Sequence, residues 1–366
     1  MMRNRTATLA RVAARYFVAL FFLLAAGEGM AQGSSAAAQP PAAAPAAVRI
    51  RMQTAFNPVL SVIGEATRQF AGTLRTISGG TVSIKILEAG WAAATPDLLD
   101  AVNDGAVDAA FTSPIYAAAK IPALALYAGI PFGPSASDYL SWLYDGDGGR
   151  LHRELYARLG MHAIPCGLLG PEAGGWFRNE INSVADFKGL RLRYNGLGGK
   201  IVEKFGATNV PTPPGELFFK LQQGKLDGTE FSMPSVDRAI GFDKLGLLYY
   251  FPGWHQPAAV LDFYMKKEKW DALELVRRAQ IETACRSTIA WTLARAPAEQ
   301  VRAMEYFRNA GVTIRTWKPE ILDALREAAA NAIAEEAQHD PDYKVVWENL
   351  SAFLEGVRGW SRLGHQ

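Results

Sequence analysis

The chain has 366 residues, of which 49% are hydrophobic and 20% are charged, a balance typical of a globular protein with a buried core. Its net charge is +2 and becomes −1 once the first 31 residues, with four Arg and one Glu, are removed. This charge excludes a basic field for nucleic acid or acidic membranes, and the length predicts about two lobes.

The first segment has the pattern of a cleaved Sec-type signal peptide. Four Arg residues precede an apolar run at 16–26, and Gly29-Met30-Ala31 supplies a small-x-small cleavage site. The run is shorter than a comfortable membrane span, which favours cleavage over an uncleaved anchor. We therefore predict a signal peptide at 1–31, export to the periplasm, and an Ala/Pro-rich tether at 32–47.

Strands alternate with helices along the next part of the chain. This alternation predicts a parallel sheet covered by helices, and it repeats between Ala163 and Phe231. The predicted elements are strands at 48–52, 82–87 and 107–111, and helices from about 58 to 77 and from Thr95 to about Asp104.

Two stretches have the same order of apolar helix, Gly, Val/Leu-Asp and strand. They are LLDAVNDGAVDAAF at 98–111 and LFFKLQQGKLDGTEF at 217–231. Two similar α/β lobes leave a cleft between them, and ligands bind at the carboxyl ends of such strands. The predicted lobes are 48–165, to which segments return from about 255, and 166–254.

The C-terminal part, 266–366, is almost wholly helical in pattern. It exceeds what one lobe needs, so it either braces both lobes or pairs with another subunit. Pro297 and Pro319 lie near predicted helix starts. The predicted helices are 273–293, 298–309, 318 to about 337, and about 342 to 357.

The stretch from Phe187 to Phe231 carries the strongest candidates for a binding site. Arg193 lies at the end of a short alternating strand, directly before Asn195 and a glycine-rich turn, whereas Arg191 is interpreted as a surface residue. Glu230 lies on the strand that follows the next helix. An Arg in this place suits a small carboxylate ligand, and Glu230 is either a cation ligand or a salt-bridge partner between the lobes.

Two glycine-rich stretches leave alternatives open. Gly196-Leu197-Gly198-Gly199 is read as a tight turn before a helix from about Lys200, with an anion site at the helix N-terminus as the alternative. Glu172 follows an apolar strand within such a stretch, and it is either a site residue or a solvated turn acid.

Several aromatic residues are candidates for the walls of the cleft. Pro252-Gly253 forces a turn that directs Trp254 and Gln256 toward the cleft. Phe56 and Trp91 follow strands of the first lobe and could line its side, although packing would explain them equally well.

Histidine and cysteine usage constrains the chemistry further. The five His residues show no paired ligand spacing, which argues against a transition-metal site. Cys166 and Cys285 could pair in an oxidising compartment or remain as two buried thiols.

Four stretches together resemble a known family: GGWFRNEINSVADFKGLRLR, GLGGKIVEKFGATNVPTPPGEL, LQQGKLDGTEF and YYFPGWHQP. They are similar to the DctP-type solute-binding proteins of TRAP transporters, especially the branch that binds 2-oxo and 2-hydroxy monocarboxylates. The likeness runs from about Val48 to at least Trp270. It implies a periplasmic-binding-protein-like α/β fold of two lobes that closes on a solute and delivers it to a TRAP membrane permease, without enzymatic activity.

The resemblance also implies roles for individual residues. Arg193 matches the Arg that pairs with the ligand carboxylate. A bound Na⁺ or Ca²⁺ would be held at positions matching Glu172, Glu230 and the backbone carbonyl of Phe231. The branch has Gln where this chain has Glu172, and often has Glu where this chain has Gln256, so acid and amide have exchanged places and both positions belong to the predicted cation site.

Two further features follow from the same resemblance. Tyr116 matches a pocket tyrosine of the branch, but the neighbouring aromatic residue is Ala117 here, which implies a wider pocket for a longer or branched acid. The branch also implies a homodimer that exchanges C-terminal helices, which the long helical region permits.

Two other functions compete with transport. A periplasmic sensor would present its carboxylate ligand to a receptor instead of a permease, and the sequence does not separate the two. An exported oxo-acid lyase would use Glu172 and Glu230 as acid and base, but no His, Lys or Cys partner supports it.

Overall fold

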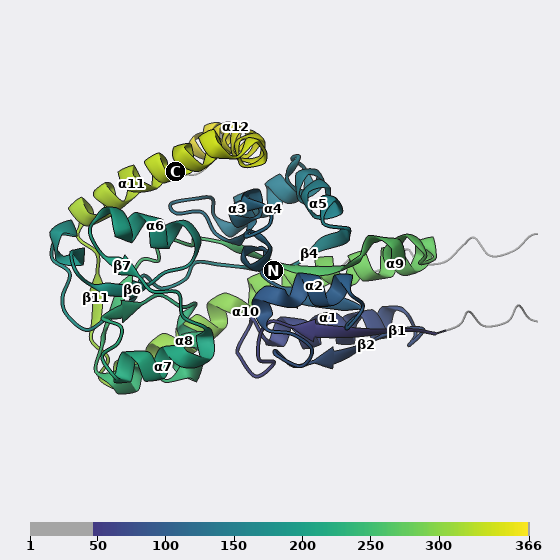
Figure 1. Cartoon of the computed structure of the whole chain (residues 1–366), viewed down its shortest axis with the longest axis horizontal. Helices are drawn as coiled ribbons and strands as arrows, with labels where there is room; N and C mark the ends of the chain where they lie inside the picture. Colours follow the sequence, from purple (N-terminus) through teal and green to yellow (C-terminus); the bar gives the residue numbers. More distant parts are fainter. Residues whose placement is uncertain (1–46, 365–366) are drawn as a thin grey trace, which may run out of the picture. The chain divides into compact units, whose positions relative to one another are not determined.

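The computed structural model describes residues 47–364 (Figure 1). The predicted signal peptide at 1–31 and all of the predicted tether except Ala47 lie outside the described residues. Between residues 47 and 364, no helix has both the length and the apolar character needed to cross a bilayer. Two β-sheets with flanking helices give the α/β class that the sequence predicts.

The first sheet has five strands in the order β2-β1-β3-β10-β4. β1 pairs in parallel with β2 and β3, as the strand–helix alternation predicts, while β10 runs antiparallel between β3 and β4. The lobe boundaries stay a prediction, and β4 extends across residue 165. The strands are β1 (Val48–Thr54), β2 (Val82–Leu87), β3 (Ala109–Thr112), β4 (Met161–Leu169) and β10 (Ala259–Lys266).

The second sheet has six strands in the order β11-β9-β5-β8-β6-β7. β6 pairs in parallel with β8, in a register that places Arg193 opposite Thr229 and so brings Arg193 beside Glu230. β11 lies in the region predicted to be almost wholly helical, and its pairing with β9 explains the difference. The strands are β5 (Gly175–Phe177), β6 (Arg191–Arg193), β7 (Thr208–Asn209), β8 (Gly228–Thr229), β9 (Leu248–Phe251) and β11 (Ile314–Thr316).

Twelve α-helices and five short 3₁₀ helices surround the sheets in the described part of the chain. The α-helices are α1 (Glu65–Ile77), α2 (Leu98–Asn103), α3 (Ala125–Ala128), α4 (Ala136–Tyr144), α5 (Gly148–Arg158), α6 (Gly196–Lys204), α7 (Pro214–Gln222), α8 (Pro234–Ile240), α9 (Lys267–Asp271), α10 (Leu275–Asn309), α11 (Pro319–His339) and α12 (Pro341–Gly364). The 3₁₀ helices are η1 (Thr95–Asp97), η2 (Pro114–Ala117), η3 (Pro122–Leu124), η4 (Val184–Phe187) and η5 (Phe242–Leu245).

Helix α1 begins later than the predicted start near residue 58. Val62 has a φ of 63°, a left-handed conformation that a helix cannot include. Gly64 then passes so close to the Asn57 carbonyl that a Cβ atom would lie 2.1 Å from its oxygen. The chain therefore turns tightly before α1, and only a residue without a side chain fits at position 64.

Helix α10 is one continuous helix of 35 residues, where the sequence predicts two segments that meet near Pro297. Its first half buries Ile281 and Cys285 in the hydrophobic cluster of the first sheet. Its second half buries Ala303 and Phe307 in the cluster of the second sheet. Burial at both ends outweighs the backbone hydrogen bond that Pro297 cannot donate.

Cys166 and Cys285 form a disulfide that joins β4 to α10. This resolves the choice between a pair and two free thiols.

The last two helices cover other helices of the fold. α11 packs against α6, and α12 packs against α4 and α5 (Figure 1).

Candidate functional site

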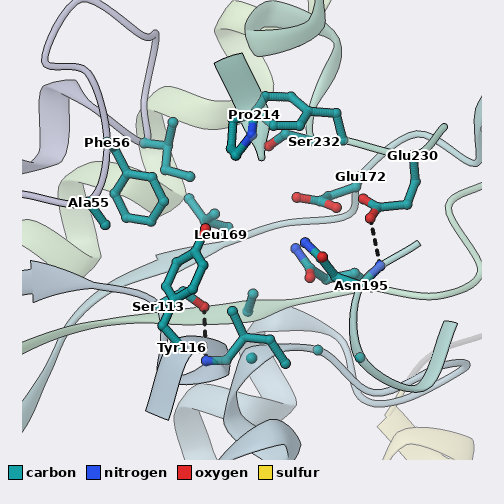
Figure 2. A pocket seen from close by; sticks show the side chains of 18 of the residues that line it. Ala55, Phe56, Ser113, Tyr116, Leu169, Glu172, Asn195, Pro214, Glu230 and Ser232 are labelled. Atoms are coloured by element: carbon teal, nitrogen blue, oxygen red, sulfur yellow. Dashed lines mark hydrogen bonds between the residues drawn. The ribbon is translucent and has the colours of Figure 1, made fainter. Parts of the chain in front are cut away.

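A cavity of about 340 Å³ lies beyond the carboxyl ends of strands from both sheets (Figure 2). Residues after β1 and β3 reach it from the first sheet, and residues at the ends of β6 and β8 reach it from the second. This is the place where open α/β sheets bind ligands. In Figure 2 the apolar side is represented by Phe56, Tyr116 and Leu169, and the polar side by Glu172, Asn195 and Glu230.

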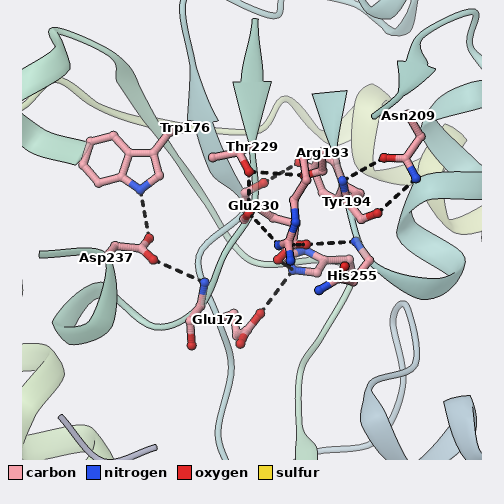
Figure 3. Close-up of polar contacts among 12 residues, drawn as sticks. Glu172, Trp176, Arg193, Tyr194, Asn209, Thr229, Glu230, Asp237 and His255 are labelled. Carbon is pink, nitrogen blue, oxygen red and sulfur yellow. Dashed lines mark hydrogen bonds and ion pairs between the residues drawn. The ribbon is translucent and has the colours of Figure 1, made fainter. Parts of the chain in front are cut away.

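Arg193 lines the cavity from the end of β6 and is only 4% exposed. Its Nη1 donates to the Glu230 Oε1 carboxylate oxygen at 2.7 Å and to the Glu230 carbonyl oxygen at 3.1 Å (Figure 3). Its Nε is buried and has no hydrogen-bond partner among the described residues. The guanidinium therefore binds the Glu230 carboxylate and still has an unused donor, its Nε–H.

Glu230 is bound from two directions. Besides Arg193, the backbone N–H of Asn195 donates to Oε1 at 2.9 Å. Burial favours the protonated form of this carboxyl, but the Arg193 charge and the hydrogen bonds outweigh burial and lower its pKa. The structure shows Glu230 in a salt bridge with Arg193 of the same sheet, and not in the predicted salt bridge between the lobes. Its role as a cation ligand stays a prediction.

His255 lies between two buried acids. Its Nε2 is 3.4 Å from Glu172 Oε2 and 3.6 Å from Glu230 Oε2, and neither ring nitrogen has a partner at hydrogen-bond geometry within the described range. Burial opposes a charge on the ring, yet the two carboxylates outweigh it and raise the pKa of His255 to about 9. Burial also raises the pKa of Glu172.

Glu172, Glu230 and His255 form a group whose ligand atoms all lie within 4.8 Å of one another. Glu172 is buried, so it is not the solvated turn acid of the alternative interpretation. Sequence reasoning did not single out His255, because its partners Glu172 and Glu230 are far away along the chain. The available signal was its position between the candidates Trp254 and Gln256.

The remaining predicted site residues divide into two groups. Asn195, Phe231, Gln256, Tyr116 and Phe56 line the cavity. The two tryptophans do not belong to the lining. Trp254 is 2% exposed and stacks between Phe132 and Tyr194, and Trp91 is 59% exposed in a turn after β2.

The glycine-rich stretch after Arg193 is the start of a helix and not only a turn. Helix α6 begins at Gly196, which has a φ of 54°, and residues 196–198 line the cavity. A Cβ atom at Gly199 would lie 2.1 Å from Asn209 Nδ2, so this position requires glycine. The helix therefore begins earlier than the predicted start near Lys200, and the first residues of the helix line the cavity. The anion site at this N-terminus stays a prediction.

Comparison with known proteins agrees with this geometry. Residues 54–340 match the family described as "Bacterial extracellular solute-binding protein, family 7". A monocarboxylate 2-oxoacid-binding periplasmic protein of Nostoc sp. is 32% identical over 317 residues, which cover 86% of each chain.

Two solved structures are similar over most of their length. A TRAP transporter solute-binding protein from Bordetella bronchiseptica, a dimer of mixed occupancy with copurified calcium and picolinate, has a TM-score of 0.84 and 29% identity; the match covers 87% of this chain and 95% of that one. A TRAP periplasmic solute-binding protein from Pseudoalteromonas atlantica, with bound sodium and pyruvate, has a TM-score of 0.82 and 28% identity, with coverage of 87% and 97%.

Proposed function

Because this chain belongs to the DctP family of TRAP-transporter solute-binding proteins, which are not enzymes, we propose that it captures a small 2-oxo or 2-hydroxy monocarboxylate in the periplasm and delivers it to a TRAP membrane permease. The supporting observation is the placement of Arg193. A permanently charged guanidinium, nearly removed from water, borders the cavity with an unused buried donor. A ligand carboxylate would supply the missing acceptor.

A cation would bind beside this carboxylate. The relatives from Bordetella bronchiseptica and Pseudoalteromonas atlantica hold calcium and sodium, respectively. Here two buried carboxylates, those of Glu172 and Glu230, converge within 4.8 Å of each other and of the His255 ring. Oxygen donors of this kind fit Na⁺ or Ca²⁺, and the Phe231 carbonyl and Gln256 would complete the set. When bound, the cation would neutralise acids of the chain and attract the ligand oxygens.

Closure of the lobes would make the binding selective. Phe56 and Tyr116 reach the cavity from the first sheet, whereas Arg193 and Glu230 reach it from the second. A ligand that contacts both sides stabilises the closed form by its additional contacts there.

The cavity favours a solute larger than a three-carbon acid. Its volume of about 340 Å³ falls in the range of roughly 300–1,000 Å³ that is typical of pockets for drug-sized ligands. The cavity lining also includes several apolar side chains, among them those of Leu60, Ile63, Ile115 and Leu261. We therefore favour a branched or aromatic 2-oxo or 2-hydroxy acid.

A thermal-shift screen of the mature protein tests the function. Short, branched and aromatic 2-oxo and 2-hydroxy acids would be added with Na⁺, with Ca²⁺ or with a chelator. We expect the fitting acids to raise the melting temperature by mass action, and the chelator to reduce this rise. The proposal is wrong if no organic acid raises the melting temperature under any of these conditions.

A further inference from the structure

Asp237 is a buried acid directly behind the wall of the cavity. It lies on α8, is 1% exposed and does not line the cavity. Its Oδ2 accepts a hydrogen bond from Trp176 Nε1 at 2.8 Å (Figure 3) and one from the Tyr249 hydroxyl at 2.8 Å. Its Oδ1 accepts the backbone N–H of Ser232 at 3.2 Å. All three donors are uncharged, so Asp237 is not held in place by an ion pair.

The Ser232 N–H belongs to the same peptide unit as the Phe231 carbonyl. Among the described residues the one cis peptide is Phe251–Pro252, so the Phe231–Ser232 peptide is trans. In a planar trans peptide the C=O and N–H groups point in opposite directions. The hydrogen bond from Ser232 to Asp237 therefore directs the Phe231 carbonyl oxygen away from Asp237.

The Phe231 carbonyl oxygen is also free to bind a ligand. No other residue between 47 and 364 donates a hydrogen bond to it. Phe231 and Ser232 both line the cavity, whereas Asp237 lies behind them. The Ser232 carbonyl in turn accepts the backbone N–H of Ala173 at 3.2 Å, which joins this segment to the one that carries Glu172.

We propose that Asp237 is a positioning residue for the cation site: by holding the Ser232 N–H, it fixes the Phe231 carbonyl as a ligand and keeps the segments of Glu172 and Glu230 in register. This rests on the proposed function, in which the Phe231 carbonyl binds the cation. Groups that orient metal ligands typically contribute about 10–100-fold in metal affinity.

The burial of Asp237 supports this role. Burial raises its pKa to about 8, although the Trp176 and Tyr249 hydrogen bonds oppose the shift. A buried acid without a cationic partner destabilises the fold, and an apolar residue would fill the space without that cost. What the acid supplies, and an apolar residue cannot, is an acceptor for three donors: Trp176 Nε1, the Tyr249 hydroxyl and the Ser232 N–H. Of these three residues, only Ser232 lines the cavity.

The test compares two substitutions at the same carboxylate. Asp237→Ala removes the acceptor of Ser232 together with those of Trp176 and Tyr249, whereas Tyr249→Phe removes one donor to the other carboxylate oxygen and keeps the stacked ring. Calcium would be titrated by calorimetry at saturating organic acid. We expect the calcium Kd to rise at least about tenfold in Asp237→Ala and to stay within about twofold of wild type in Tyr249→Phe.

A signal from the peptide itself separates positioning from general damage. Phe231–Ser232 is the one Phe–Ser dipeptide in the sequence, so carbonyl-¹³C Phe combined with ¹⁵N Ser gives a single NMR correlation. In wild type we expect calcium to shift the Phe231 carbonyl resonance. In Asp237→Ala we expect the Ser232 amide proton to move upfield, with the calcium-induced carbonyl shift appearing only at higher concentration.

Asp237→Asn provides the conservative variant, and it is the decisive one if Asp237→Ala does not fold. The Ser232 amide signal shows whether the carboxamide oxygen of Asp237→Asn still accepts the Ser232 N–H. We expect the calcium affinity to be retained if it does and to be weakened if it does not. Wild-type calcium affinity in a variant that has lost the Ser232 bond would overturn the inference alone. If cations change neither the melting temperature of the wild-type protein nor its Phe231 carbonyl resonance, the proposed cation site is overturned as well.

Discussion

At the residue scale, Arg193 has the most demanding environment of the cavity. It is nearly excluded from water, its Nη1 is bound by Glu230, and its Nε has no partner in the described structure. A buried charge is costly unless its hydrogen-bond donors find acceptors. A ligand that supplies the missing acceptor is therefore bound more tightly. The ligand affinity should therefore depend strongly on this side chain.

Replacing Arg193 by Ala should weaken acid binding by at least about 100-fold, because breaking a buried charge pair costs about 3–5 kcal/mol. Calorimetry with the best acid of the thermal-shift screen measures the change. Arg191→Ala is the matched control: it lies on the same strand, is exposed, and pairs with Asp227 at 2.7 Å. Its affinity should stay within about twofold of wild type. Near-native affinity in Arg193→Ala would refute the assignment.

Gly129 tests the position of Gln256 in the cavity wall. Gly129 has a φ of 146°, and a Cβ atom there would lie 2.7 Å from Gln256 Cγ. Gly129→Ala should displace the Gln256 side chain and lower the ligand affinity about tenfold, with a backbone cost of about 1–3 kcal/mol. Gly72→Ala in α1, where nothing lies within 4 Å, should leave binding unchanged. Unaltered binding in Gly129→Ala would remove Gln256 from the site.

His255 predicts a specific pH dependence of stability. Although burial opposes its charge, Glu172 and Glu230 raise the pKa of His255 from 6.5 to about 9. A raised folded-state pKa means that the stabilisation is complete below pH 6.5 and is lost as the pH rises through about 9. The raised pKa of Glu172 acts in the same direction, because the folded state binds that proton more tightly.

This dependence can be measured by denaturant unfolding without acid or cation. The free energy of unfolding of wild type relative to His255→Gln should fall by on the order of 3 kcal/mol between about pH 6 and pH 10. His339→Gln, at the exposed end of α11, is the control and should leave the profile unchanged. A pH-independent difference between wild type and His255→Gln would contradict the charged state of this ring.

At the element scale, the link between β4 and α10 is covalent. The disulfide closes a loop with a sequence separation of 119 residues, which restricts the unfolded chain. The double substitution Cys166→Ala with Cys285→Ala should lower the free energy of unfolding by about 2–5 kcal/mol. Neither cysteine lines the cavity, so acid affinity should be retained. Equal unfolding midpoints for the two proteins would show that the bond contributes nothing.

The elements also show what the sequence could predict. The strand–helix alternation was enough for the parallel pairing of β1 with β2 and β3, because local hydrophobic patterns specify such units. The continuity of α10 through Pro297 was not predictable, because the burial that outweighs this proline comes from two distant clusters. Strand β11 was missed for the same reason: three residues become a strand only by pairing with β9.

The site was predictable only where a local rule applied. Arg193 and Glu230 lie at the ends of β6 and β8, and the strand-end rule together with the resemblance identified both. His255 depended on contacts with acids that are distant in sequence. Trp91 and Trp254 show the converse, because an aromatic residue near a strand end packs or lines a cavity according to tertiary contacts.

At the scale of the whole molecule, binding should be coupled to closure. The cavity takes residues from both sheets, so an acid bound with its cation would hold the two together. Small-angle X-ray scattering should show a smaller radius of gyration with acid and cation present. Arg193→Ala, at the same concentrations, should keep the unliganded value. An unchanged radius in wild type at saturation would mean that binding does not require closure.

Helix α10 has a practical consequence for dissecting this protein. One half of its buried face completes the hydrophobic cluster of the first sheet, and the other half completes that of the second. Cutting the chain into two separate pieces, one for each sheet, would leave one piece with a groove where a helix belongs. Both sheets depend on α10 for part of their hydrophobic core. The two halves must therefore be made, purified and studied as one polypeptide.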